Sequence, residues 1–222
     1  MGLFIEPNGN IVIESAVEQL VDPNCNLRVQ GCLMAACEWC LPFPALVQAA
    51  LAIGEACFAK KIIGHVSVDF VVFMERSSVR MWAVDLDLYL TDKTMAFELS
   101  RFLTDSTFDL QKGQLLTDEG APRSFISSGL IRHPKLSAIP HGHFFQLCRE
   151  ENFIFDIESF QGPIFSLVDT LLKGVIGVTF VLSTFLLCLC YLSQPCVELL
   201  SRLLSVYPCV RILVEGYLIS RA

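Results

Sequence analysis

The sequence predicts an α+β fold, with a mostly antiparallel sheet and helices packed on one face. Two β-rich segments, residues 66–73 and 81–90, are separated by a short polar turn, which favours antiparallel pairing of neighbours. Residues 45–60 and 95–103 carry apolar side chains at intervals of three and four, which is typical of helices. Strands and helices of this kind in irregular order favour α+β over a parallel α/β fold.

The remaining elements follow from local signals. An Asn8-Gly9 turn between the apolar runs 3–5 and 11–13 predicts an N-terminal hairpin. Polar, turn-rich sequence fills much of residues 108–120. Three further strands and one short helix are expected: the strands at 124–128, 153–157 and 163–168, and the helix at 143–151.

Composition excludes several classes of protein. Hydrophobic residues make up 53% of the 222 residues and charged residues only 18%, so a disordered polyelectrolyte is excluded. The net charge of −7 leaves no cationic surplus for phosphates, so we expect no nucleic-acid partner. Ten cysteines are too few for a disulfide scaffold, and the N-terminus has no secretory signal pattern. We therefore expect reduced thiols, with Cys37 and Cys40 on a buried apolar face or, alternatively, in a redox or zinc site.

The C-terminal part of the chain has a different composition from the rest. Residues 174–192 carry no charge, and nineteen helical residues would span about 28 Å, close to a hydrocarbon core. We therefore divide the chain into a domain at 1–180 and a hydrophobic helical tail at 181–222, with a candidate transmembrane segment at about 174–194. One alternative is a buried core strand plus helix. Another is a non-homologous end that arose from a shifted reading frame or a retained intron, and we favour this explanation for the origin of the tail.

Three acids on the two central strands form the candidate site. Asp85 and Asp87 are two residues apart and so share a face of their strand, while Asp69 lies mid-strand in an apolar run. If the strands pair, Asp69 lies near the other two, and a divalent cation such as Mg²⁺ would relieve the repulsion of three carboxylates. Ser67 shares the face of Asp69. The alternative is a solvated polar face without a metal.

These strands resemble the end of an ATP-grasp ligase domain. The strand G-H-V-S-V-D-F-V-V-F and the strand A-V-D-L-D-L resemble the pair that holds Mg²⁺ and ATP phosphates in such enzymes. Further matching segments, among them R-F-L-T-D-S-T-F-D and F-F-Q-L-C-R, extend the resemblance over about residues 1–180. The chain is similar to the C-terminal ATP-grasp-like lobe of the IQ-motif-containing protein H family, which is related to peptide-forming carboxylate–amine ligases.

The resemblance implies Mg²⁺ and ATP as cofactors and Asp69, Asp85 and Asp87 as metal ligands. Asp85 stands where most active members have Glu, and Asp87 stands where they have Asn. An Arg usually follows closely, whereas this chain has Leu88, Tyr89 and Leu90. This removes a guanidinium group that could donate two parallel hydrogen bonds to a phosphate or carboxylate. No Gly-rich phosphate loop is found in the sequence.

We therefore expect a truncated ATP-grasp-like domain with a vestigial Mg²⁺–nucleotide site. Its ancestral reaction is ATP-dependent carboxylate–amine ligation, and we expect it to be inactive alone. The alternatives are a non-catalytic interaction module, which would have a protein partner, and a membrane-anchored protein. Family resemblance implies a cytoplasmic location, or a membrane if the tail is genuine. Calmodulin binding is expected only through a segment that these 222 residues lack.

Overall fold

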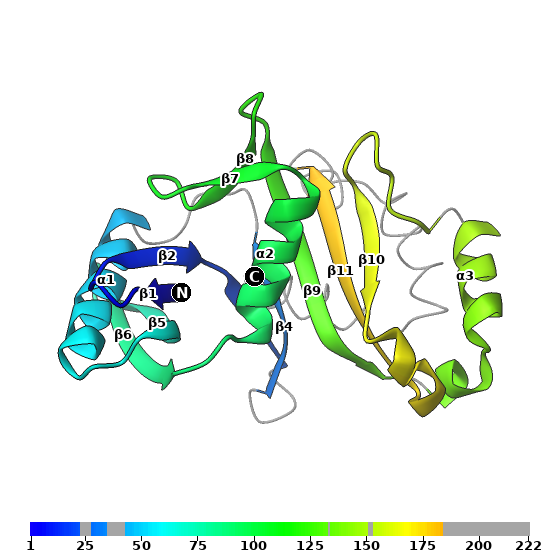
Figure 1. Cartoon of the computed structure of the whole chain (residues 1–222), viewed down its shortest axis with the longest axis horizontal. Coiled ribbons are helices and arrows are strands. Elements are labelled where there is room, and N and C mark those ends of the chain that lie inside the picture. Colours follow the sequence, from blue (N-terminus) through cyan, green and yellow to red (C-terminus); the bar gives the residue numbers. More distant parts are fainter. Residues whose placement is uncertain (23–27, 35–42, 133, 151–152, 184–222) are drawn as a thin grey trace. The chain divides into compact units, whose positions relative to one another are not determined.

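The computed structural model describes residues 1–22, 28–34, 43–132, 134–150 and 153–183 (Figure 1). The chain divides into two compact units. Unit 1 comprises Met1–Val17 and Ala36–Ala121, and unit 2 comprises Glu18–Ala35 and Pro122–Ala222. Both units combine antiparallel strands with few helices, which confirms the predicted α+β class.

Unit 1 is built on a four-stranded antiparallel sheet in the order β2-β1-β5-β6. Two helices and the β7–β8 hairpin complete it (Figure 1). The elements are β1 (Gly2–Ile5), β2 (Ile11–Ser15), α1 (Phe43–Ala59), β5 (Gly64–Glu75), β6 (Ser78–Asp87), α2 (Asp92–Leu103), β7 (Ser106–Asp109) and β8 (Gln114–Thr117). The N-terminal hairpin, both helices and the β5–β6 pair are confirmed, whereas β7 and β8 lie in a segment expected to be mainly turns.

The core of unit 1 forms where α1 packs on the sheet. Leu3 and Ile5 of β1 are fully buried, and Val66 and Val68 of β5 are 1% exposed. Leu46 and Ala50 of α1 belong to the same cluster. Alternation places these strand residues on one face, because successive side chains in a strand point to opposite sides.

The first turn of α2 meets the other face of this sheet. Gly2, next to Leu3 in β1, faces away from the α1 core, and a Cβ atom on it would meet the hydroxyl groups of Ser15 and Thr94. Ser15 and Thr94 also hydrogen bond to each other, at 3.2 Å. The expectation that both helices lie on one face therefore differs from the structure at this turn, because the side chain missing from Gly2 leaves room for α2.

Unit 2 is built on strands in the order β10-β11-β9-β4-β3, all antiparallel. Its elements are β3 (Glu18–Asp22), β4 (Arg28–Met34), β9 (Pro122–Arg132), the 3₁₀ helix η1 (Pro134–Ala138), α3 (His141–Glu150), β10 (Gly162–Ser166), the 3₁₀ helix η2 (Val168–Lys173) and β11 (Val175–Ser183). The strands expected near 124–128 and 163–168 and the helix expected at 143–151 are confirmed.

The strand expected at 153–157 is wrong. Within the described part of that segment the structure has only an isolated bridge between Asp156 and Gln161. The Asp156 carboxylate accepts a bond from the amide of Glu158 at 3.0 Å and one from the hydroxyl of Ser159 at 2.6 Å. These bonds lower the pKa of Asp156 and favour a turn over an extended strand.

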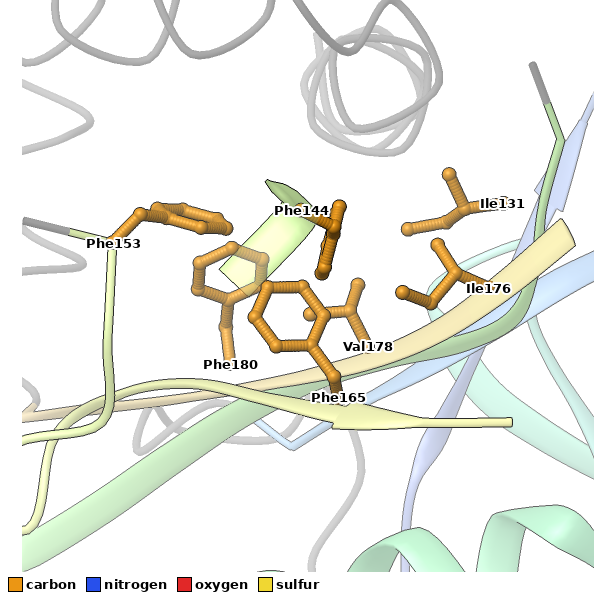
Figure 2. A pocket seen from close by; sticks show the side chains of 7 residues that line it. All are labelled: Ile131, Phe144, Phe153, Phe165, Ile176, Val178 and Phe180. Carbon is orange, nitrogen blue, oxygen red and sulfur yellow. The ribbon is translucent and has the colours of Figure 1, made fainter. Parts of the chain in front are cut away.

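Aromatic side chains fill the core between α3 and the sheet of unit 2. Figure 2 shows Phe144 of α3 above Phe165 of β10 and Val178 of β11. The rings of Phe144 and Phe165 meet edge to face, with centroids 5.0 Å apart. The pocket among them is entirely apolar, and its volume of about 20 Å³ has room for one water-sized group.

Candidate functional site

The three aspartates of the candidate site lie on the β5–β6 pair. The register sets Asp69 opposite Asp85 and Ser67 opposite Asp87. Directly opposite residues of an antiparallel pair share a face, as do residues two apart in one strand. The three carboxylates and the Ser67 hydroxyl are therefore carried on one face of the sheet; alternation predicted this for Asp85 and Asp87, and the register of the strand pair adds Asp69. The register shifts directly after Asp69, so a β-bulge bends the pair next to these groups.

Asp69 is bound by a lysine from the next helix. The ammonium nitrogen of Lys93 lies 2.7 Å from Oδ1 and 3.0 Å from Oδ2 of Asp69. The Lys93 side chain is 20% exposed and the Asp69 side chain 21%. Because water screens such a sheltered pair only in part, it is stronger than an ordinary surface ion pair.

Helix α2 holds Lys93 over the sheet through its N-terminal turn. Thr91 is the N-cap residue, and its hydroxyl accepts a bond from the amide of Thr94 at 3.4 Å. Lys93 is the second residue of the helix, so the cap fixes the direction in which its side chain leaves the backbone. Thr91 and Thr94 are both buried, which anchors this turn.

The other two carboxylates also have partners within the protein. Oδ1 of the exposed Asp85 accepts the amide of Leu86 at 2.8 Å. Asp87 is hydrogen-bonded to the side chain of Tyr89. This bond, together with the negative charge of Asp87, raises the pKa of the Tyr89 hydroxyl, since ionised tyrosine would face a carboxylate.

The α-amino group of Met1 lies near the same charges. It donates a hydrogen bond to the carbonyl of Val68 at 3.0 Å. Burial lowers its pKa to about 6, although the charge of Asp69 acts in the opposite direction. Lys93 supplies a positive charge that Asp69 contacts directly.

Carboxylates on one face of a sheet do not by themselves make a site for a shared Mg²⁺ ion. A metal ion needs several oxygen ligands that converge on one point. The described part of the chain contains no group of three or more His, Cys, Asp or Glu side chains that could hold a metal ion. Binding of a cation by Asp69, Asp85 and Asp87 therefore stays a prediction, and we derive no reaction step from it.

Comparison with known proteins places this site in a family. The IQCH-like, ATP-grasp family matches residues 1–111. The chain belongs to this family. Among curated proteins, IQ motif-containing protein H of Danio rerio is 26% identical over 183 residues. This match covers 79% of the chain and 17% of the relative, so the chain spans about a sixth of that protein's length.

The family match contains the whole candidate site of this IQCH-like ATP-grasp chain, because β5, β6 and α2 all lie within residues 1–111. Sequence reasoning identified the aspartates and missed Lys93. The predicted helix at 95–103 left Lys93 in a loop, whereas the structure starts α2 at Asp92. Thr91 followed by Asp92 is an N-terminal helix signal that could have moved the predicted start and placed Lys93 beside the strands.

The structure corrects the prediction for the hydrophobic tail. Residues Val175–Ser183 form β11, which pairs with β9 on one side and β10 on the other. A transmembrane helix that begins at about 174 is therefore wrong, because this β-branched segment supplies a strand of unit 2. Residues 184–222 lie outside the described part, as do Cys37 and Cys40. No described helix combines the length and apolar character needed to span a membrane.

Cys148 of α3 is expected to react slowly. It is 5% exposed in the aromatic cluster of unit 2, and burial raises the pKa of its thiol to about 11. Because only the thiolate reacts, iodoacetamide at pH 8 should modify it about 100-fold more slowly in the folded chain than in urea. Mass spectrometry of the tryptic peptide 136–149, which contains no other cysteine, measures this rate. Equal rates in both states would contradict the burial of Cys148.

The raised thiol pKa also predicts a pH dependence of stability. The folded state holds this proton to a higher pH than the unfolded state does. Its contribution is therefore fully present below the unfolded pKa of about 8.5–9 and is lost as the pH rises toward 11. Urea unfolding at pH 8 and pH 10 should show this decrease, and Cys148→Ala should reduce it.

Proposed function

We propose that this chain is a non-catalytic module derived from an ATP-grasp domain, with a vestigial Mg²⁺–nucleotide site on the β5–β6 face. The observation that carries the proposal is the register of that strand pair. It keeps Asp69, Asp85 and Asp87 on one face within the segment that matches the family. Each of these carboxylates contacts a donor from the chain itself.

Two features of the site support loss of catalysis. By resemblance, active members carry Glu and Asn where this chain has Asp85 and Asp87, followed by an Arg that this chain lacks. The resemblance assigns the neutralisation of transferred phosphate charge to Mg²⁺. Here Asp69 instead contacts the ammonium group of Lys93. The ammonium group of Lys93 thus occupies both carboxylate oxygens of Asp69, the acid that the resemblance assigns to the metal.

Exposed apolar side chains on the same hairpin favour a second candidate function, that of a protein-interaction module. Met74 is 67% exposed, Trp82 64% and Val84 55%. The Trp82 ring packs edge to face on Phe73, with centroids 4.7 Å apart. Exposed, rigid aromatic groups of this kind are common at protein interfaces. This candidate is compatible with the first, since an inactive lobe can serve as a scaffold.

Thermal unfolding with Mg·ATP tests the proposal. A functional site at a hundredfold excess of ligand over its Kd would add about 2.7 kcal/mol of stability. For a chain of this size that corresponds to a rise in Tm of roughly 5–10 °C. We expect a change below about 1 °C and no release of ADP when carboxylate and amine substrates are added.

Two variants make the titration specific. Asp85→Ala removes a carboxylate of the acidic face, and Glu119→Ala removes an exposed carboxylate from the turn that follows β8. Both variants should respond to Mg·ATP as the unmodified chain does. A saturable rise in Tm that Asp85→Ala abolishes and Glu119→Ala keeps would overturn the vestigial assignment, and ADP release would overturn the non-catalytic one.

A further inference from the structure

The contact between Lys93 and Asp69 has the character of cation binding. One ammonium nitrogen lies within 3.0 Å of both carboxylate oxygens of Asp69. A divalent metal ion bound by this carboxylate would approach the same two oxygens. The ammonium group and a metal ion therefore compete for one carboxylate. The ammonium group has the advantage that it belongs to the same chain and is held beside the carboxylate by the fold.

The position of Lys93 in its helix makes this contact notable. The N-terminal turn of a helix carries a partial positive charge, which disfavours a lysine there. Lys93 is the second residue of α2, and its side chain points to the sheet, where it is only 20% exposed. Local preference would instead leave this side chain in water. The Asp69 carboxylate offsets the unfavourable position, so the pair is a specific feature of this fold.

Lys93 brings a positive charge to a face that carries other acidic groups. On the adjacent strand, Asp85 and Asp87 add negative charge to the same face. An ammonium ion on Asp69 therefore lowers the net negative charge of a face that would otherwise attract a divalent cation.

We propose that Lys93 takes the place of a divalent cation on the β5–β6 face, so that the acidic strand pair folds without metal and binds metal weakly. This inference rests on the proposed function, because it explains how a vestigial site is kept stable. Lys93 is a positioning residue here, and its role is to neutralise Asp69.

Binding of Mn²⁺ to the full chain tests this role without nucleotide. Mn²⁺ suits carboxylate oxygens, and electron paramagnetic resonance distinguishes free from bound Mn²⁺. Three variants are compared with the unmodified chain: Lys93→Met, Lys93→Arg and the double variant Asp69→Asn/Lys93→Met. We expect Lys93→Met to bind Mn²⁺ at least tenfold more tightly than the unmodified chain. Lys93→Arg should resemble the unmodified chain, and the double variant should lose the gain, because it lacks the Asp69 carboxylate.

Thermal unfolding provides the second readout. Lys93→Met should have a lower Tm than the unmodified chain in EDTA, and Mn²⁺ should restore part of the difference. The Tm of the unmodified chain should be the same in EDTA and in Mn²⁺. If Lys93→Met does not fold, the Tm of the unmodified chain in EDTA and in Mn²⁺ still tests the inference. The Mn²⁺ affinity of the double variant, which loses one negative and one positive charge together, tests it as well.

Three results would overturn the role of Lys93. They are a saturable rise in the Tm of the unmodified chain with Mn²⁺, equal Mn²⁺ affinity of the unmodified chain and Lys93→Met, or a gain in affinity that persists in the double variant. None of them depends on ATP. Failure of this inference is therefore distinguishable from failure of the proposed function, which is decided by the response to Mg·ATP and by ADP release.

Discussion

Replacement of Phe97 by alanine should lower the free energy of unfolding by about 3–5 kcal/mol. Phe97 of α2 is fully buried, and its ring packs edge to face on Phe108 with centroids 4.9 Å apart. Truncation removes this apolar surface and leaves a cavity under the helix that carries Lys93. Urea unfolding followed by circular dichroism measures the loss, and hydrogen exchange of α2 amides shows whether it is centred there.

Phe102 provides a matched control on the same helix. Its side chain is 81% exposed, so Phe102→Ala should change the free energy of unfolding by less than about 0.5 kcal/mol. A Phe97→Ala variant as stable as Phe102→Ala would show that Phe97 does not anchor α2. The position of Lys93 over Asp69 would then need another explanation than the packing of this helix.

The central strand pair could be predicted from sequence because its signals are local. Residues 66–73 are β-branched and aromatic, the segment that follows alternates, and a short polar turn joins them. Strand alternation also places Asp85 and Asp87 on one face without knowledge of tertiary structure. The pairing partner of Asp69 could not be inferred in this way, because the register shift directly after Asp69 moves it from Val84 to Asp85.

The contact between Lys93 and Asp69 could not be predicted in this way. It depends on the path of the chain from β6 to α2 and on the space above Gly2, where a Cβ atom would meet two hydroxyl groups. Neither the path of the chain nor the space above Gly2 leaves a periodic pattern in the sequence. Strands β3 and β4 were also missed: β4 contains Gly31, which weakens a strand pattern. In the structure a Cβ atom at Gly31 would meet the carbonyl oxygen of Ser127, so close approach of β9 explains the glycine.

The uncharged segment at 174–192 shows how composition can mislead. A long apolar run is compatible with a membrane helix, a buried helix or a buried strand, and only its partners decide between them. Here β11 pairs with β9 and β10, and Ile176, Val178 and Val181 are 1–5% exposed. Burial on both sides of a central strand removes the alternation that would have identified it.

A glycine at the start of β10 is expected to be as critical as the aromatic core. Gly162 has a φ of +119°, which side-chain-bearing residues rarely adopt. A Cβ atom there would also lie 2.5 Å from the carbonyl oxygen of Ile154 and 3.0 Å from the Cα atom of Phe155. Gly162→Ala should therefore lower the free energy of unfolding by about 3–5 kcal/mol, with backbone strain and overpacking both contributing.

Two other glycines separate these contributions. Gly120 has a φ of +76° with nothing within 4 Å of a Cβ atom, so Gly120→Ala carries strain alone and should cost about 1–2 kcal/mol. Gly142 in α3 has neither a positive φ nor a close neighbour, so Gly142→Ala should stabilise the chain by roughly 0.5 kcal/mol. Urea unfolding measures all three, and hydrogen exchange of β10 and β11 amides shows whether the effect of Gly162→Ala is centred there. If Gly162→Ala cost no more than Gly120→Ala, the backbone at Ile154 and Phe155 would have to yield, and close approach would not explain the glycine that opens β10.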